Sequence, residues 1–95
     1  MIPKKVKISG HIVQIEVTKD RVKYHGTDSS GCAALMQNKI FIEANNNIQF
    51  QHEVLMHEIL EHINYQYQIE MPHDKLTTLS QALYQVMKDN KLKFD

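Results

Sequence analysis

Residues 51–67, with the sequence QHEVLMHEILEHINYQY, contain neither glycine nor proline, and their apolar members recur at helical spacing. The apolar stripe consists of Leu55, Ile59 and Ile63, widened by Phe50, Leu60 and Tyr67. Asn45, Asn46 and Asn47 precede the segment and can cap its first free amides, whereas Pro72 follows it and breaks the pattern. The sequence therefore predicts one long helix over about residues 48–67.

The chain before residue 45 has the two-residue period of strands instead. Val6 and Ile8 share one parity, Val13, Ile15 and Val17 share the other, and Ser9-Gly10 lies between the two sets. This switch predicts a tight hairpin with strands near 4–8 and 11–18. A second hairpin is predicted from residues 33–37 and 39–44, and residues 19–32, rich in Asp, Gly and Ser, predict a loop or an irregular edge.

A second helix is predicted after Pro72, over about residues 74–89, with Asp74 as its N-cap and Asn90 as its stop. Its apolar residues are expected to form a buried stripe: Leu76, Leu79, Leu83, Val86 and Met87. Residues 1–95 thus make a single α+β domain, in which a small antiparallel sheet of three to four strands is followed by two helices.

Composition argues against several classes of protein. The formal net charge is zero and Arg21 is the single arginine, so there is no basic field to attract nucleic acid. The apolar runs are too short to span a bilayer, and the first ten residues lack the apolar segment of a secretory signal. Cys32 is the only cysteine and cannot form an internal disulfide, which favours a reducing compartment. We therefore expect a cytoplasmic protein without a membrane or nucleic-acid partner.

The predicted helix over residues 48–67 carries a candidate metal site. His57 and Glu61 are four residues apart and share a helical face, while Glu58 points about 100° away from His57. A neutral imidazole and a carboxylate both bind zinc, and a hydrolytic site also needs a base that takes a proton from water. The motif H-E-x-x-E therefore predicts His57 and Glu61 as metal ligands and Glu58 as the catalytic base. The expected metal is Zn²⁺, and the same ligand types also suit Fe²⁺.

A third ligand must come from elsewhere in the chain. His73 is one candidate if the loop 68–72 folds back toward the helix, and its alternative role is a residue of the next helix's first turn. His62 is the competing candidate, but it lies five residues past His57 and points about 140° away around the helix. Glu53, one turn before His57, is expected to hold the other imidazole nitrogen. No site role is assigned to His11, His25 or Cys32.

The run LMHEILEHI, preceded by NKIFIEAN and followed by MPHDKLTTLSQALYQVMKDN, resembles the small zincin-like metallopeptidase-type proteins that phages and prophages encode. The resemblance covers residues 39–90 and implies a minimal zincin-like fold, with a short sheet before a helix that carries H-E-x-x-H or H-E-x-x-E. It implies that His57 and Glu61 bind the metal and that Glu58 is the catalytic base. A further ligand would come from the position of His73.

Two functions from different classes follow. The first is a zinc-dependent hydrolase of phage or mobile-element type, most simply a peptidase. In it an edge strand, 33–37 or 39–44, holds an extended peptide or protein substrate by strand addition. The second is a non-catalytic accessory or host-directed binding protein on the same scaffold, with a structural metal or none. Its motivation is the small size of the chain, together with the glutamate at position 61 where the usual motif has a second histidine.

Overall fold

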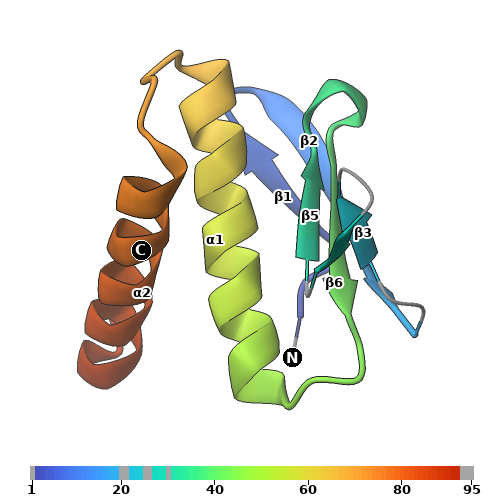
Figure 1. The fold of residues 1–95 in the computed structure, drawn as a ribbon. Coiled ribbons are helices and arrows are strands. Elements are labelled where there is room, and N and C mark those ends of the chain that lie inside the picture. Colours follow the sequence, from blue (N-terminus) through green and yellow to red (C-terminus); the bar gives the residue numbers. More distant parts are fainter. Residues whose placement is uncertain (1, 20–21, 25–26, 30, 93–95) are drawn as a thin grey trace.

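The computed structural model describes residues 2–19, 22–24, 27–29 and 31–92. His25 therefore lies outside the described residues. The strands are β1 (Lys5–Ile8), β2 (His11–Thr18), β3 (Val22–Tyr24), β4 (Thr27–Ser29), β5 (Gly31–Ala34) and β6 (Lys39–Glu43). The helices are the short 3-10 helix η1 (Leu35–Gln37), α1 (Ile48–Gln66) and α2 (His73–Asn90). The predicted α+β class, a small sheet followed by two helices, is confirmed (Figure 1).

The main sheet has the strand order β1-β2-β6-β5, and it is mixed rather than antiparallel. β1 pairs with β2 and β5 pairs with β6 in antiparallel fashion, but β2 and β6 are parallel, with Gln14 opposite Lys39. The prediction of a purely antiparallel sheet is therefore wrong in this detail. The chain passes through β3, β4 and β5 before β6 enters the middle of the sheet, and it enters in the direction of β2.

The first hairpin has the predicted form. Ser9 and Gly10 both have positive φ, 51° and 82°, which is the backbone that a two-residue hairpin turn requires. The turn reverses the chain between strands of opposite parity, so that Ile8, Val13 and Ile15 all reach the core.

Short strands lie in the described part of residues 19–32. β3 and β4 pair antiparallel with each other, and β5 begins at Gly31. The strand predicted over 33–37 ends at Ala34, because η1 follows and Asn38 adopts a left-handed conformation with φ 53°. Turn-forming composition predicted a loop or an irregular edge here, and the described residues form short paired strands.

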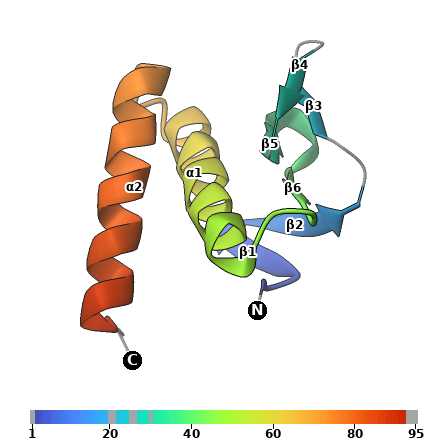
Figure 2. The same cartoon turned by 60° about the horizontal axis from the view of Figure 1, so that its bottom comes forward.

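α1 packs on one face of the sheet, and α2 packs on α1 on the side away from the sheet (Figures 1 and 2). The buried core consists of Ile8, Val13, Ile15, Ile40, Ile42 and Leu55. Ile59 and Ile63 of α1 pack against this core, as the apolar stripe predicted, whereas Phe50 and Tyr67 are exposed. No helix in the described part of the chain has the length and apolar character that a membrane span requires.

The caps of the two helices differ. Asn47 caps α1 as predicted, since its side-chain oxygen accepts a hydrogen bond from the Phe50 amide at 2.9 Å. α2 starts one residue earlier than expected, with Pro72 as its N-cap and without a side-chain capping bond. Asp74 lies in the first turn, where its charge favours the helix dipole. The prediction of Asp74 as the N-cap is wrong, because Pro72 already sets the backbone angle at which the helix begins.

The predicted buried stripe of α2 is mostly exposed. Leu76 is buried, but Leu79, Leu83, Val86 and Met87 are all classed as exposed. α2 contacts α1 over a narrow face. Leu79, Leu83 and Val86 lie largely outside this face, whereas Met87 lines a groove with Leu55 and Ile59 of α1. Sequence periodicity identified an apolar face correctly but not what covers it.

Candidate metal centre

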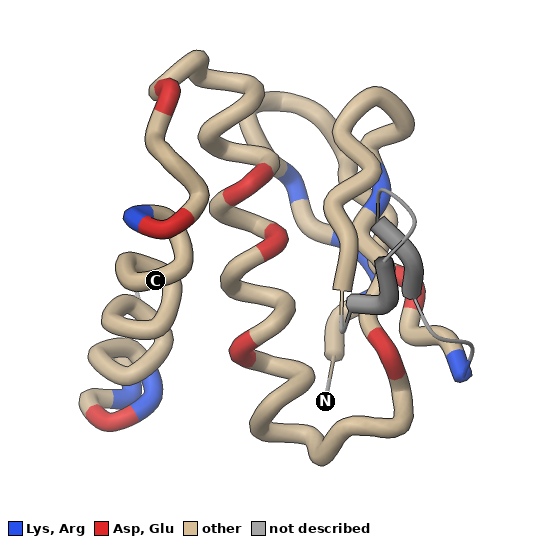
Figure 3. The backbone as a smooth tube through the Cα atoms, viewed as in Figure 1, with Lys and Arg blue, Asp and Glu red and all other residues tan. Residues whose placement is uncertain are grey.

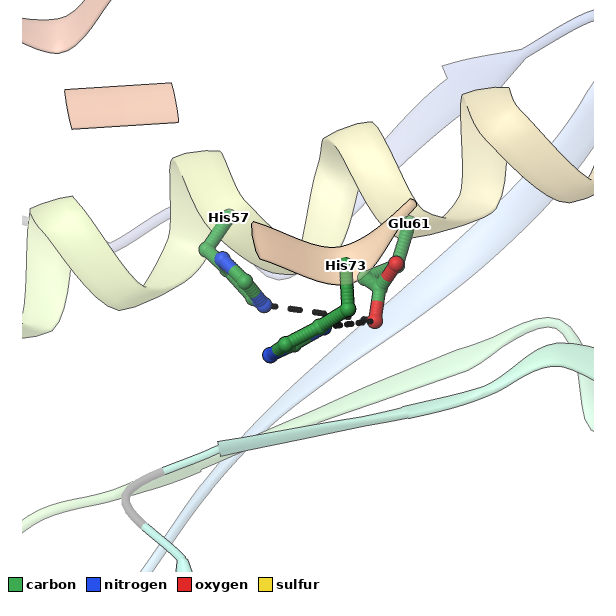
Figure 4. Close-up of side chains that lie close together, drawn as sticks. All are labelled: His57, Glu61 and His73. Atoms are coloured by element: carbon green, nitrogen blue, oxygen red, sulfur yellow. Dashed lines mark ion pairs between the residues drawn. The ribbon is translucent and has the colours of Figure 1, made fainter. Parts of the chain in front are cut away.

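Three side chains from two helices converge at one point (Figure 4). His57 and Glu61 project from consecutive turns of α1, and His73 reaches back toward them from the first residue of α2. The Glu61 Oε2 atom lies 3.9 Å from His57 Nε2 and 3.5 Å from His73 Nδ1. One ligand atom from each residue lies within 4.8 Å of the other two, so the group can hold a metal ion.

His73 reaches the site because Asn64 folds the connection between the helices back on itself. The Asn64 side chain makes two hydrogen bonds to the backbone of Met71, accepting from its N–H at 2.9 Å and donating to its carbonyl at 3.0 Å. Gln68 and Glu70 adopt positive φ, 52° and 61°, within the same connection. Sequence reasoning missed Asn64, because an asparagine near the end of a helix has no unique partner in the sequence.

His62, the competing candidate, points elsewhere. Its ring is fully buried, and Nε2 donates a hydrogen bond to the backbone carbonyl of Lys39 at 2.9 Å. This bond ties α1 to the start of β6 and occupies the nitrogen that faces the sheet. The structure therefore brings His73 to His57 and Glu61 and leaves His62 outside the group. The turn of the helix between His57 and His62 separates them, as the five-residue spacing indicated.

The environment of His57 favours the neutral imidazole that a metal requires. Burial lowers the pKa of His57 below its ordinary value, Glu61 opposes this shift, and His73 adds to it. The ring thus presents a lone pair rather than a proton at neutral pH. The ring centroids of His57 and His73 lie 5.1 Å apart and the ring planes are nearly perpendicular, at 76°, so the two imidazoles meet edge to face.

Glu58 occupies a different place from its neighbour His57. It is 7% exposed, and burial, followed by the negative charge of Glu61, raises its pKa to about 8. α1 carries three glutamates, Glu53, Glu58 and Glu61, without a lysine or arginine (Figure 3). In the metal-free protein Glu58 therefore holds its proton at neutral pH, and a nearby cation would favour the ionised form.

Gly31 lets α1 approach β5 closely at Glu58. A Cβ atom at position 31 would overlap Val54 Cγ1 and would lie 3.0 Å from Glu58 Oε2. The carboxyl group of Glu58 therefore lies at the contact between α1 and β5, the terminal strand of the sheet. A single glycine in a Ser-Gly-Cys run resembles a turn residue, and for this reason the sequence did not reveal its role in packing.

Two further expectations concern residues near the site. Among the described hydrogen bonds none joins Glu53 to His57, so the expected orienting role of Glu53 is not present in this structure. Burial, followed by the charge of Glu58, raises the pKa of the Cys32 thiol, which keeps it protonated. A protonated thiol is a weaker metal ligand than a thiolate.

Comparison with protein-family models, with curated proteins and with solved structures gives no match for this chain. The class of site is therefore defined by its own geometry: two imidazoles and a carboxylate around one point, with a buried carboxyl group beside them.

Proposed function

We propose that this protein is a zinc-dependent hydrolase that cleaves peptide bonds. The observation that carries the proposal is the convergence of His57, Glu61 and His73 within 4.8 Å. Catalytic zinc sites use three protein ligands and leave one position open, and two histidines with one glutamate form such a set. His73 has a side chain that is 71% exposed, so the group opens to solvent on that side.

The ligand atoms suit zinc in type as well as in number. His57 is neutral at neutral pH, and the carboxylate of Glu61 contributes a negative charge that partly offsets a divalent cation. Bound zinc would supply Lewis acidity, which acidifies water and polarises a carbonyl group. Fe²⁺ would accept the same donors, so metal analysis must identify the ion.

In this proposal Glu58 is the general base. Its raised pKa means that the metal-free protein holds the carboxyl group protonated, in a seam between α1 and β5. Burial is the larger cause of this raised pKa and the charge of Glu61 is the smaller one. A divalent cation near Glu61 would offset the smaller cause and lower the pKa of Glu58, which favours the carboxylate. Glu58 then accepts a proton from water and returns it to the leaving amine, the two transfers that peptide hydrolysis requires.

β5 is the strand that would hold the substrate. It is the terminal strand of the main sheet and lies against α1 beside Glu58. β6, the other strand considered, pairs on both sides and has no edge for strand addition. An extended peptide added along the outer edge of β5 would extend the sheet, and its backbone would supply the hydrogen bonds.

The test begins with protein purified without a histidine tag. Elemental analysis is expected to find about one zinc per chain, and a peptide mixture analysed by mass spectrometry is expected to show cleavage that a chelator abolishes. Glu58→Gln should retain zinc but lower the cleavage rate by about 10²–10⁴-fold. Glu53→Gln, a matched change on the same helix, should leave both unchanged. Full cleavage by Glu58→Gln would exclude the proposed base.

A second function, a non-catalytic binding protein with a structural metal, is favoured by one observation. The ligands lie on two helices, so a bound ion would fasten the first turn of α2 to α1. This reading predicts that zinc stabilises the fold and that no peptide is cleaved by the parent protein or by Glu58→Gln. The same two measurements therefore separate the two functions.

A further inference from the structure

α2 presents two different apolar faces. One face packs on α1: Leu76 and Ser80 are 1% and 3% exposed, and Tyr84 and Met87 line a groove with Leu55 and Ile59 of α1. The other face contains Leu79, Leu83 and Val86, which are 39%, 36% and 41% exposed. Each of these lies one residue before a member of the first face, which places the second face about 100° around the helix.

The exposed face has the spacing of a helix-pairing seam. Leu76, Leu79, Leu83, Val86 and Asn90 follow one another at intervals of three, four, three and four residues. This is the a/d spacing of a heptad pattern, sustained over the length of α2. Leu76 is buried in the monomer, whereas Leu79, Leu83 and Val86 are partly exposed, so the exposed part of this seam is free to pair with a second helix. Exposed apolar stripes of this kind mark interaction surfaces in proteins that are otherwise polar outside.

Charges beside the seam favour a second copy of α2 in the antiparallel direction. Lys75, Ala82 and Asp89 flank the seam at intervals of seven residues, on the side away from α1. Pairing Leu79 with Leu83 of a second copy places Lys75 beside Asp89 of that copy, and Asp89 beside its Lys75. Ala82, the small middle residue, lies near the two-fold axis and allows the helices to approach. The helix dipoles also oppose one another in this arrangement.

We propose that α2 is the homodimerisation surface of this protein, in an antiparallel pair about a two-fold axis near Ala82. The two central layers join Leu79 to Leu83 of the second copy, and Val86 lies outside these layers, because Leu76 of each copy is already buried within its own monomer. Asp89 already accepts a hydrogen bond from Gln85 at 3.0 Å through Oδ2, which leaves Oδ1 for the lysine. An interface of one helix pair is smaller than those of most stable complexes, so we expect a weak dimer whose population depends on protein concentration.

Sedimentation over a concentration series tests the proposal. The parent protein should shift from monomer to dimer as its concentration rises. Leu83→Glu should remain monomeric throughout, with an unchanged circular dichroism spectrum because Leu83 is already exposed in the monomer. Gln81→Glu, on the opposite side of α2, is the matched control and should dimerise as the parent does. A parent protein that stays monomeric at millimolar concentration, or association that survives Leu83→Glu, overturns the proposal.

A charge exchange tests the antiparallel register. Lys75→Asp alone sets an acid beside Asp89 of the second copy, and Asp89→Lys alone sets a lysine beside its Lys75. Each single change should raise the dissociation constant at least about threefold, the effect of a surface charge pair, while the double variant should restore the parent value. Two single changes whose effects simply add in the double variant would overturn this register. Association with a different protein, with none between copies of this chain, would do the same.

Discussion

Helices α1 and α2 are 19 and 18 residues long, and they treat polar and apolar residues in opposite ways. The buried residues of α1 are Gln51, Leu55, Glu58 and His62, three of which are polar. α2 buries Leu76 and Ser80, and it exposes Leu79, Leu83, Val86 and Met87. Burial of polar groups costs free energy, and exposed apolar groups do not contribute the free energy that their burial would give. Each helix therefore departs from the usual pattern in a way that lowers stability.

The two departures have different physical explanations. The buried polar groups of α1 have tasks inside the molecule: Gln51 donates to the carbonyls of Ala44 and Asn46, and His62 donates to that of Lys39. Glu58 differs from them, because its burial raises its pKa and makes the ionised carboxylate unfavourable. Buried carboxyl groups with raised pKa values are often found at functional sites. Leu79, Leu83 and Val86 of α2, by contrast, stay partly exposed in the described part of the chain. This contrast supports the proposals that α1 carries the chemistry and that α2 carries the association.

The largest expected effect concerns the charge of Glu58. Its pKa is about 8 in the folded, metal-free protein and 4.5 in an ordinary environment. Between these values the unfolded chain loses a proton that the folded chain keeps, so rising pH destabilises the fold. The free energy of unfolding should fall by on the order of 5 kcal/mol over this range. Below pH 4.5 and above pH 8 the contribution is constant.

Denaturant titrations of the metal-free protein and of Glu58→Gln would measure this effect. His57 acts in the opposite direction at low pH, because its pKa is lowered and the unfolded chain binds its proton more readily. Both proteins contain His57, so the difference between them isolates Glu58. Equal pH dependence in the two proteins would show that Glu58 is not protonated in the folded protein at neutral pH. The contrast between α1 and α2 would then lack its strongest example.

Zinc should stabilise the parent protein next most strongly. At a free concentration one hundred times the dissociation constant, binding adds about 2.7 kcal/mol to the free energy of unfolding. His57→Ala should abolish this gain, whereas Glu53→Ala, one turn earlier on α1, should preserve it because Glu53 is not in the ligand group. Thermal unfolding with and without zinc measures both. An equal zinc effect in His57→Ala would remove α1 from the metal site.

Asn64→Ala should weaken the site through position rather than through ligation. The change removes two hydrogen bonds to Met71, which together contribute about 1–3 kcal/mol to stability, and it frees the connection that brings His73 to α1. Zinc affinity should fall about 10–100-fold, as for residues that orient ligands. Isothermal titration measures it. Asn90→Ala, which loses one bond within its own helix, is the control and should bind zinc normally.

The smallest expected effect is on the exposed face of α2. Leu76→Ala, on the buried face of the same helix, is the reference and should cost about 2–4 kcal/mol of unfolding free energy, because Leu76 is 1% exposed. Leu79→Ala should cost less than about 1 kcal/mol when measured in dilute solution, where the monomer predominates. Chemical denaturation of the two variants at low and high protein concentration provides the check. A large cost for Leu79→Ala in the monomer would show that this face is covered within one chain.

Most secondary structure was predictable because it depends on local patterns. The Ser9-Gly10 turn, the Asn47 cap and the extent of α1 follow from parity, capping and helical period. The direction of β6 was not predictable, because parallel and antiparallel pairing require the same apolar alternation in a short strand. The brief strands β3 and β4 were missed for a related reason, since three residues are too few to show a period.

Because helical geometry is the same wherever a helix forms, the sequence alone places His57 and Glu61 side by side on α1 and Glu58 apart from them. It also determined that α2 has an apolar stripe. That His73 rather than His62 joins His57 and Glu61 depends on packing between segments distant in the sequence. Hydrogen bonds between Asn64 and Met71 close the connection that brings His73 to the site. Tertiary packing likewise decided the surroundings of Glu58 and the exposure of Leu79, Leu83 and Val86. Burial is a property of what lies opposite a residue, and distant parts of the chain supply it.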